Sequence, residues 1–84
     1  MKFIKKIELL LKKTLSLQKI YVTGDNNHIK IIAISDTFTN MNEINRQKII
    51  YKPLISFIEN KTIHAISIKT YSTIEWENNK LNSE

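Results

Sequence analysis

The absence of cysteine is the feature that most restricts what this chain can fold into. Without thiols no disulfide can crosslink the chain, so a hydrophobic core must stabilise the fold unaided. Its 84 residues allow one core rather than two, which predicts a single domain over residues 1–84 and argues against a multi-step enzyme. Hydrophobic residues make up 42% and charged residues 25%, as in ordinary globular proteins, so we expect this domain to fold.

The chain is basic, with 13 Lys and Arg residues against 8 Asp and Glu residues. A net charge of +5 suits a polyanion or an acidic protein surface as a partner. However, 12 of the 13 cations are lysines, and 16 isoleucines and 9 asparagines accompany them, the usage that A/T-rich codons produce. Two interpretations of this charge remain open: it has a function, or it only reflects the composition.

No segment of the sequence predicts a signal peptide or a membrane span. Charges at Lys5, Lys6 and Glu8 interrupt the first apolar stretch. The longest later apolar run, Ile31 to Ile34, is far shorter than the ~20 residues that cross a bilayer. We therefore expect a soluble cytoplasmic protein that does not bind membranes.

The first half of the chain predicts a helix and a β-hairpin. Apolar residues recur every three or four positions from Phe3 to Leu17, with lysines between them, which is typical of an amphipathic helix. A membrane-surface helix is possible, but a solvated lysine face above a core is commoner, and we adopt it. Segments 19–23 and 28–35, rich in Ile, Val and Tyr, flank the turn formers of residues 24–27 and predict the hairpin.

The middle of the chain predicts two short helices. Asn40 and Glu43 have the spacing of a capping box, so we expect a helix to begin near Met41. Pro53 disfavours helical geometry at Lys52, which predicts a kink and then a second helix. The expected apolar face of these helices is formed by Ile44, Ile49 or Ile50, Tyr51, Leu54, Ile55 and Ile58.

The last third of the chain predicts a strand and a short helix. Ile63 to Ser72 alternates as a third strand does, with Ile66 and Ile68 expected to be buried and Lys69 to face solvent. Residues 72–75, Ser-Thr-Ile-Glu, form a second capping box that opens a helix containing Trp76. We expect residues 78–84 to fray, which leaves a core of about 3–77.

Together these elements predict an α+β sandwich, a three-stranded mixed sheet with helices on one face in the order αββααβα. The long connection between the second and third strands allows them to run parallel. The order is similar to that of class II KH domains, although a chain with one glycine cannot contain their G-x-x-G clamp.

His28 and His64 are the only side chains that ordinarily titrate near neutrality. No nucleophile, zinc or phosphate-binding motif accompanies them, so the sequence predicts no enzyme. Each can be an ordinary polar residue at a strand end. Two imidazoles cannot complete a metal site by themselves, so any metal needs ligands from elsewhere.

The segment from Ile63 to Tyr71, IHAISIKTY, followed by Glu75-Trp76, resembles the characteristic segment of the BolA family, in particular its short IbaG-like branch. The hairpin of residues 22–28, Phe38 after an acidic turn, and residues 46–54 resemble the same branch in the same order. The resemblance covers roughly Leu15 to Trp76. It implies a fold similar to class II KH domains without their clamp.

The resemblance also implies a function. BolA-like proteins pair with a monothiol glutaredoxin and share a [2Fe-2S] cluster in iron trafficking and in iron or stress sensing. His64 stands at the position of the family's cluster ligand, and His28 at a hairpin position that is histidine or cysteine across the family. The glutaredoxin cysteine and glutathione would supply thiolates. Neutral imidazole ligands would raise the reduction potential of the cluster, as in Rieske centres.

We expect the two histidines to differ, His64 being held rigidly by the third strand as the obligatory ligand and His28 being mobile in its turn as a tuning ligand. The chain departs from the family pattern at Asn40, where glycine is expected, at Glu43, where a basic residue is expected, and at Thr73, where proline is expected.

Two alternatives remain. The chain can be a DNA-binding transcriptional regulator of stress or morphology that binds weakly and in a salt-sensitive way. Its phosphate contacts would be Arg46, Lys48, Lys52 and Lys69. A purely structural acid-stress protein without a ligand is the weaker alternative.

Overall fold

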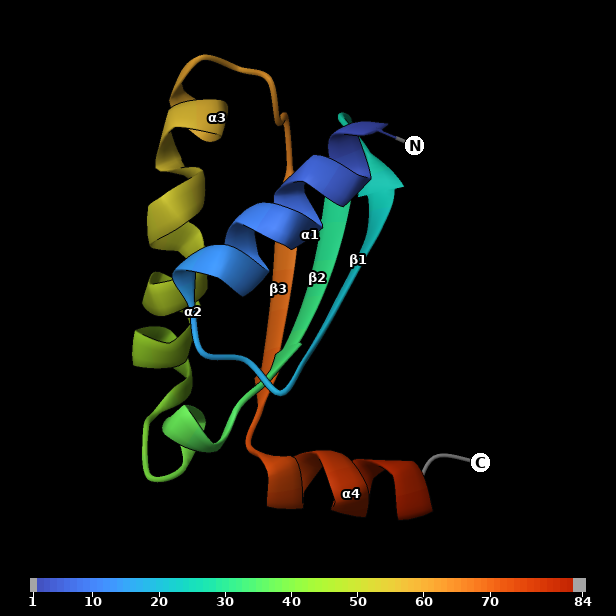
Figure 1. The fold of residues 1–84 in the computed structure, drawn as a ribbon, viewed down its shortest axis with the longest axis vertical. Coiled ribbons are helices and arrows are strands. Elements are labelled where there is room, and N and C mark those ends of the chain that lie inside the picture. The colour runs from blue at the N-terminus through green and yellow to red at the C-terminus, as the bar shows by residue number, and fades with distance from the viewer. Residues whose placement is uncertain (1, 83–84) are drawn as a thin grey trace.

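The structure, a computed structural model, describes residues 2–82 and contains a three-stranded sheet packed with helices (Figure 1). The predicted order of elements is confirmed. In chain order the elements are α1 (Lys2–Thr14), β1 (Lys19–Asp25), β2 (His28–Ile34), the 3-10 turn η1 (Asp36–Phe38), α2 (Glu43–Tyr51), the 3-10 turn η2 (Lys52–Leu54), α3 (Ile55–Glu59), β3 (Ile66–Tyr71) and α4 (Thr73–Asn82).

The sheet has the strand order β1-β2-β3 and mixes both pairings. β1 and β2 form an antiparallel hairpin in which Tyr21 pairs with Ile32. β2 and β3 run parallel, with Ile31 opposite Ile68, because the chain crosses over through α2, η2 and α3. The predicted hairpin and the parallel third strand are both confirmed.

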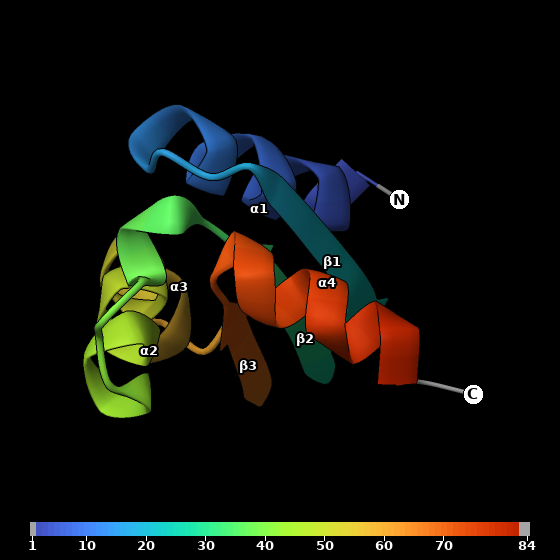
Figure 2. The ribbon, with the colours of Figure 1, turned by 90° about the horizontal axis from the view of Figure 1, so that it is seen from below.

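The core lies between the sheet and α1, α2 and α3, which cover one of its faces (Figure 2). Ile7 and Leu11 of α1 are fully buried against it, which confirms that the lysine-rich helix covers a core with its apolar stripe. α1 ends at Thr14, earlier than the expected Leu17. The other buried apolar residues of the core are Ile20, Ile29, Ile31, Ala33, Phe38, Ile50, Leu54 and Ile63.

The last helix departs from the expectation that all helices share one face. α4 lies across one end of the sheet (Figures 1 and 2), and the ring of its Trp76 packs against Tyr71 at 5.2 Å and Tyr21 at 5.9 Å between centroids. α4 also continues to Asn82, where the sequence led us to expect fraying from residue 78. Residues 83–84 of that expected tail lie outside the described residues.

The start of α2 corrects one predicted cap. Asn42, rather than Asn40, is the N-cap, since its side-chain oxygen accepts a hydrogen bond from the Asn45 N–H at 2.9 Å. Asn40 instead has a φ of 68°, in the left-handed region that glycine and asparagine tolerate best. This explains how asparagine replaces the glycine of the family pattern.

The break after α2 is also milder than predicted. Lys52 keeps helical dihedral angles, with φ −54° and ψ −49°, although it precedes Pro53. The chain accommodates Pro53 by tightening into η2 and then continues as α3, so two short helices with an irregular junction are confirmed.

The third strand is shorter than expected, because β3 begins at Ile66 and not at Ile63. Ile66 and Ile68 are only half-buried, whereas Thr70 is buried and Lys69 is exposed as predicted. β3 is an edge strand, so its side chains have a neighbouring strand, β2, on one side and none on the other. No helix among the described residues is long and apolar enough to cross a membrane.

Candidate functional site

The β1–β2 turn has a tightly determined geometry. Gly24 has a φ of 100°, and a Cβ at that position would stand 2.1 Å from the carbonyl oxygen of His28. The Asp25 carboxylate accepts hydrogen bonds from the N–H groups of Asn27 at 3.0 Å and His28 at 3.3 Å. Glycine and aspartate at these positions therefore fix where β2 starts, and β2 starts at His28.

The loop before β3 is bound to this turn. The His64 N–H donates to the carbonyl oxygen of Asn26 at 3.0 Å, and the Ile29 N–H donates to the carbonyl oxygen of Ala65 at 3.0 Å. His28 and His64, far apart in the sequence, therefore lie at the same end of the sheet. In Figure 1 this is the end where the chain enters β3 from α3.

The two imidazole rings are held differently from our expectation. The Nε2 atom of His28 lies 2.7 Å from the hydroxyl oxygen of Ser67, a side chain on β3. His64 lies in a bend before β3, its side chain is exposed, and its ring makes no hydrogen bond within residues 2–82. The His28 ring therefore has a side-chain partner and the His64 ring has none within residues 2–82, the reverse of the restraint that we expected, because Ser67 reaches His28 and β3 starts after His64.

Two exposed imidazoles at one end of the sheet supply at most two of the four ligands that a tetrahedral metal site requires. No group of three or more His, Asp or Glu side chains that could hold a metal occurs in the described part of the chain. The chemistry that this pair offers is nitrogen ligation from an accessible surface, where a second molecule can approach. Thiolates or further ligands would have to come from that molecule.

Arg46 is not available to bind phosphate. It is 8% exposed, and its guanidinium forms a two-pronged ion pair with the Glu75 carboxylate at 2.6 and 3.0 Å. Its Nε atom donates to the Met41 carbonyl oxygen at 3.0 Å, and its guanidinium carbon lies 5.9 Å from the centre of the Phe38 ring. Arg46 therefore connects α2 to α4, and its guanidinium is engaged in these contacts rather than exposed as a DNA contact would require.

Electrostatics at this junction follow from the same contacts. The hydrogen bonds from Arg46, and next the bond from the Ser72 N–H at 2.9 Å, lower the pKa of Glu75 to about 2. The bond to Glu75 in turn raises the pKa of Arg46. Ser72 and Glu75 also complete the predicted capping box, since the Ser72 hydroxyl accepts from the Glu75 N–H at 3.2 Å.

Of the three lysines proposed with Arg46, Lys48 and Lys52 are four residues apart on α2 and η2, and Lys69 lies apart from both. Lys48 lines a groove between α2 and β3, whereas Lys52 borders a hollow with Thr14, Leu15, Ile49 and Pro53. Lys69 lies on the other face of the sheet, beside Lys30. These lysines therefore do not form the single basic surface that the sequence suggested.

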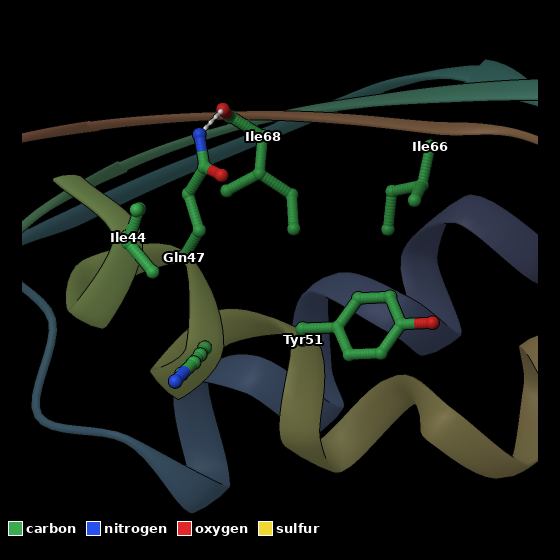
Figure 3. A pocket seen from close by; sticks show the side chains of 6 residues that line it. Ile44, Gln47, Tyr51, Ile66 and Ile68 are labelled. Atoms are coloured by element: carbon green, nitrogen blue, oxygen red, sulfur yellow. Dashed lines mark hydrogen bonds between the residues drawn. The ribbon is translucent and has the colours of Figure 1, made fainter.

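The groove between α2 and β3 was missed by the sequence analysis (Figure 3). It has a volume of about 360 Å³, and in it the Gln47 side-chain amide donates to the Ile68 carbonyl oxygen at 3.1 Å. Ile44 and Tyr51, expected on the apolar face of the helix, are 67% and 39% exposed beside it. Their separation of seven residues, two helical turns, was the available signal of an apolar stripe. The groove is lined by Ile44, Gln47, Lys48, Tyr51, Ile66 and Ile68.

Comparison with known proteins gives one consistent match. The family model described as BolA-like protein matches residues 10–75. An uncharacterized protein of Buchnera aphidicola subsp. Baizongia pistaciae is 62% identical over 72 residues, 86% of this chain and 91% of that protein. The acid stress protein IbaG of Escherichia coli strain K12 is 40% identical over 77 residues, 90% of this chain and 92% of IbaG.

More distant matches agree. The DNA-binding transcriptional regulator BolA of Escherichia coli strain K12 is 37% identical over 54 residues, 64% of this chain and 50% of that protein. Among solved structures, a Bol-like protein from Babesia bovis has a TM-score of 0.78 at 24% identity and covers 92% of each chain. BolA1 from Arabidopsis thaliana has a TM-score of 0.75 at 22% identity, covering 86% of this chain and 93% of that one. The two structures are evidence for the fold alone.

Proposed function

Because this chain belongs to the BolA family and is similar to IbaG, we propose that it is a non-enzymatic adaptor that binds a monothiol glutaredoxin. In the complex the two proteins share a [2Fe-2S] cluster during iron–sulfur trafficking or iron and stress sensing. The observation that supports the proposal is that the backbone hydrogen bond from the His64 N–H to Asn26 brings His28 and His64, both exposed, to the same end of the sheet.

The donor set fits such a shared cluster. A chain without cysteine has no thiolate to offer, so the sulfur ligands come from the glutaredoxin cysteine and glutathione. The cluster supplies the electron-accepting iron centre, and imidazole ligation removes negative charge from it relative to thiolate. This chain contributes neutral nitrogen ligands, the loop that carries them and a surface around them for the partner.

His64 is best suited to be the principal ligand. Its ring is exposed and engaged in no hydrogen bond with residues 2–82, so a metal can bind without breaking an existing contact. Its backbone is nevertheless fixed to Asn26, which limits how far the loop can move. His28 can take part through its Nδ1 atom, since Ser67 occupies the Nε2 side of the ring.

Acid should weaken the shared cluster, because only the neutral imidazole has a lone pair for a metal. Protonation of His64 would remove the ligand and add a positive charge at the same place. The complex is therefore expected to lose its cluster as the pH falls, which would connect cluster occupancy to acid conditions.

Reconstitution tests the proposal. The purified protein is mixed with a monothiol glutaredoxin, glutathione, iron and sulfide, and the visible circular dichroism spectrum and the mass of the complex are recorded. We expect a heterodimer whose spectrum differs from that of the cluster-bound glutaredoxin alone. His64→Ala should abolish that difference, whereas His28→Ala should give a complex that forms but loses its cluster faster.

Glu59→Ala is the matched control, since it changes an exposed residue at the end of α3 and no proposed ligand. It should leave the spectrum of the complex unchanged. A His64→Ala protein with the wild-type spectrum and cluster lifetime would rule out the proposed ligation.

The alternative of a DNA-binding regulator has lost its structural basis as first stated, because Arg46 is engaged with Glu75 and Lys69 lies apart from Lys48 and Lys52. Weak duplex binding with a strong salt dependence and little sequence preference remains a prediction.

A further inference from the structure

The sheet has a second face that α1, α2 and α3 do not cover (Figure 2). Side chains alternate along each strand, so the residues that do not point into the core point to this side. We call it the open face. It consists of Lys19, Tyr21, Thr23 and Asp25 on β1, His28, Lys30, Ile32 and the buried Ile34 on β2, and Ser67, Lys69 and Tyr71 on β3.

The open face is positively charged. Each strand contributes one lysine, and Lys19, Lys30 and Lys69 are all exposed. Among the strand residues pointing to this side, the only carboxylate is Asp25, which lies at the turn and accepts two backbone hydrogen bonds there. The strand residues on this side therefore carry a net positive charge, which attracts a negatively charged partner.

The lysines flank an apolar hollow. Lys30 and Lys69 border a depression of about 230 Å³ whose other lining residues are Ile31, Ile32 and Ser67. Ile32 pairs with Lys69 on one side and Tyr21 on the other. Standard strand spacings put the Cα atoms of Lys30 and Lys69 about 8 Å apart. A ligand in the hollow would thus contact an apolar floor between two ammonium groups.

Aromatic rings continue the surface beside the hollow. Tyr21 is 44% exposed, and its ring lies 5.9 Å from the ring of Trp76, at an interplanar angle of 33°. Trp76 in turn packs against Tyr71. Tyr21 therefore has a ring that is supported on one side and accessible to a planar ligand.

We propose that the open face binds a single-stranded nucleic acid, with Lys30 and Lys69 contacting phosphates and Tyr21 stacking on a base. A flat sheet has no protruding helix or ribbon to enter the groove of a duplex. Single strands, in contrast, lie across sheet surfaces, stack unpaired bases on aromatic rings and place phosphates beside lysines. This activity is separate from cluster binding and uses neither His28 nor His64.

Fluorescence anisotropy with labelled oligonucleotides of roughly twelve residues tests this proposal. The probes are oligo(U), oligo(dT) and a duplex of the same length, titrated without glutaredoxin. Lys30→Gln/Lys69→Gln should weaken single-strand binding at least tenfold. It should also reduce the slope of log affinity against log salt by about 1.4, at about 0.7 per lost phosphate contact.

Lys48→Gln/Lys52→Gln is the matched control, because it removes the same charge from α2 and η2. It should change affinity less than twofold. Equal losses from the two double variants would show that net charge, and not the open face, determines binding, and would overturn the proposal.

The stacking contact has its own test. Tyr21→Leu should weaken binding about fivefold or more, whereas Tyr21→Phe, which keeps the ring, should bind like the wild type. Duplex binding as tight as single-strand binding, or tighter binding to poly-glutamate or to vesicles of anionic phospholipid, would contradict the assignment of a single-stranded nucleic acid.

Discussion

The ion pair between Arg46 and Glu75 makes a quantitative prediction about acid stability. The pair joins α2 to the first turn of α4, and Glu75 also accepts a hydrogen bond from the Ser72 N–H at 2.9 Å. Arg46 is buried, so replacing Glu75 with glutamine leaves its guanidinium with a neutral acceptor in place of a carboxylate. We therefore expect Glu75→Gln to destabilise the protein.

The size of the effect follows from the pKa of Glu75, which the bonds from Arg46 and Ser72 lower from 4.5 to about 2. Such a shift corresponds to about 3 kcal/mol at full strength. The Glu75 side chain is 48% exposed, and solvent screening reduces the expected contribution to about 1–2 kcal/mol. Because the folded-state pKa is the lower one, this stability is present above pH 4.5 and is lost as the pH falls through about 2.

Urea denaturation followed by far-UV circular dichroism measures both quantities. At neutral pH, Glu75→Gln should unfold with a free energy about 1–2 kcal/mol below that of the wild type, and the two proteins should converge near the pKa of about 2. Glu77→Gln, an exposed change on the same helix, serves as the control and should have little effect. A Glu75→Gln protein as stable as the wild type at neutral pH, or a deficit that persists in strong acid, would refute the reasoning.

Three further changes test local features. Gly24→Ala should lower the free energy of unfolding by roughly 2–4 kcal/mol in thermal denaturation. The added Cβ would clash with the His28 carbonyl oxygen, and the φ of 100° is unfavourable for alanine. Ser67→Ala should alter the tautomer ratio of His28 in nitrogen NMR spectra of the free protein, whereas Ser67→Thr should preserve it; an unchanged ratio in both would argue against the Ser67 contact. Asn42→Ala should lower the free energy of unfolding by about 1 kcal/mol in urea titrations, because it removes the cap of α2. Asn40→Gly is the control and should be nearly neutral, because glycine tolerates the left-handed φ of Asn40. Asn40→Ala is unsuitable as a control, since it would lose stability through its φ without any cap being involved.

The two capping boxes show what local sequence can and cannot predict. The Ser72–Glu75 pattern predicted the start of α4 correctly, because both reciprocal bonds form within four residues. The Asn40–Glu43 pattern failed although its spacing is the same. Asn42 competes for the cap, and the preceding turn requires a left-handed residue at Asn40. Neighbouring asparagines thus made the local signal ambiguous.

The candidate site depends on contacts that no local pattern encodes. Hydrophobic periodicity was enough to predict the strands and the core face of α1, and the long connection between β2 and β3 indicated that they can run parallel. The resemblance to the family pointed to His28 and His64. How each is held depends on a residue distant from it in the chain, Ser67 for the ring of His28 and Asn26 for the backbone of His64. Arg46 looked like a surface cation because its partner, Glu75, lies 29 residues away.

The central claim, that this chain supplies an imidazole ligand to a shared cluster, is tested most directly by pulsed electron paramagnetic resonance. Only this protein is labelled with nitrogen-15, the complex with unlabelled glutaredoxin and glutathione is assembled, and the cluster is reduced. We predict a nitrogen-15 hyperfine coupling of a directly bound imidazole, which His64→Ala removes. A reduced cluster in an intact heterodimer without any such coupling would contradict the account.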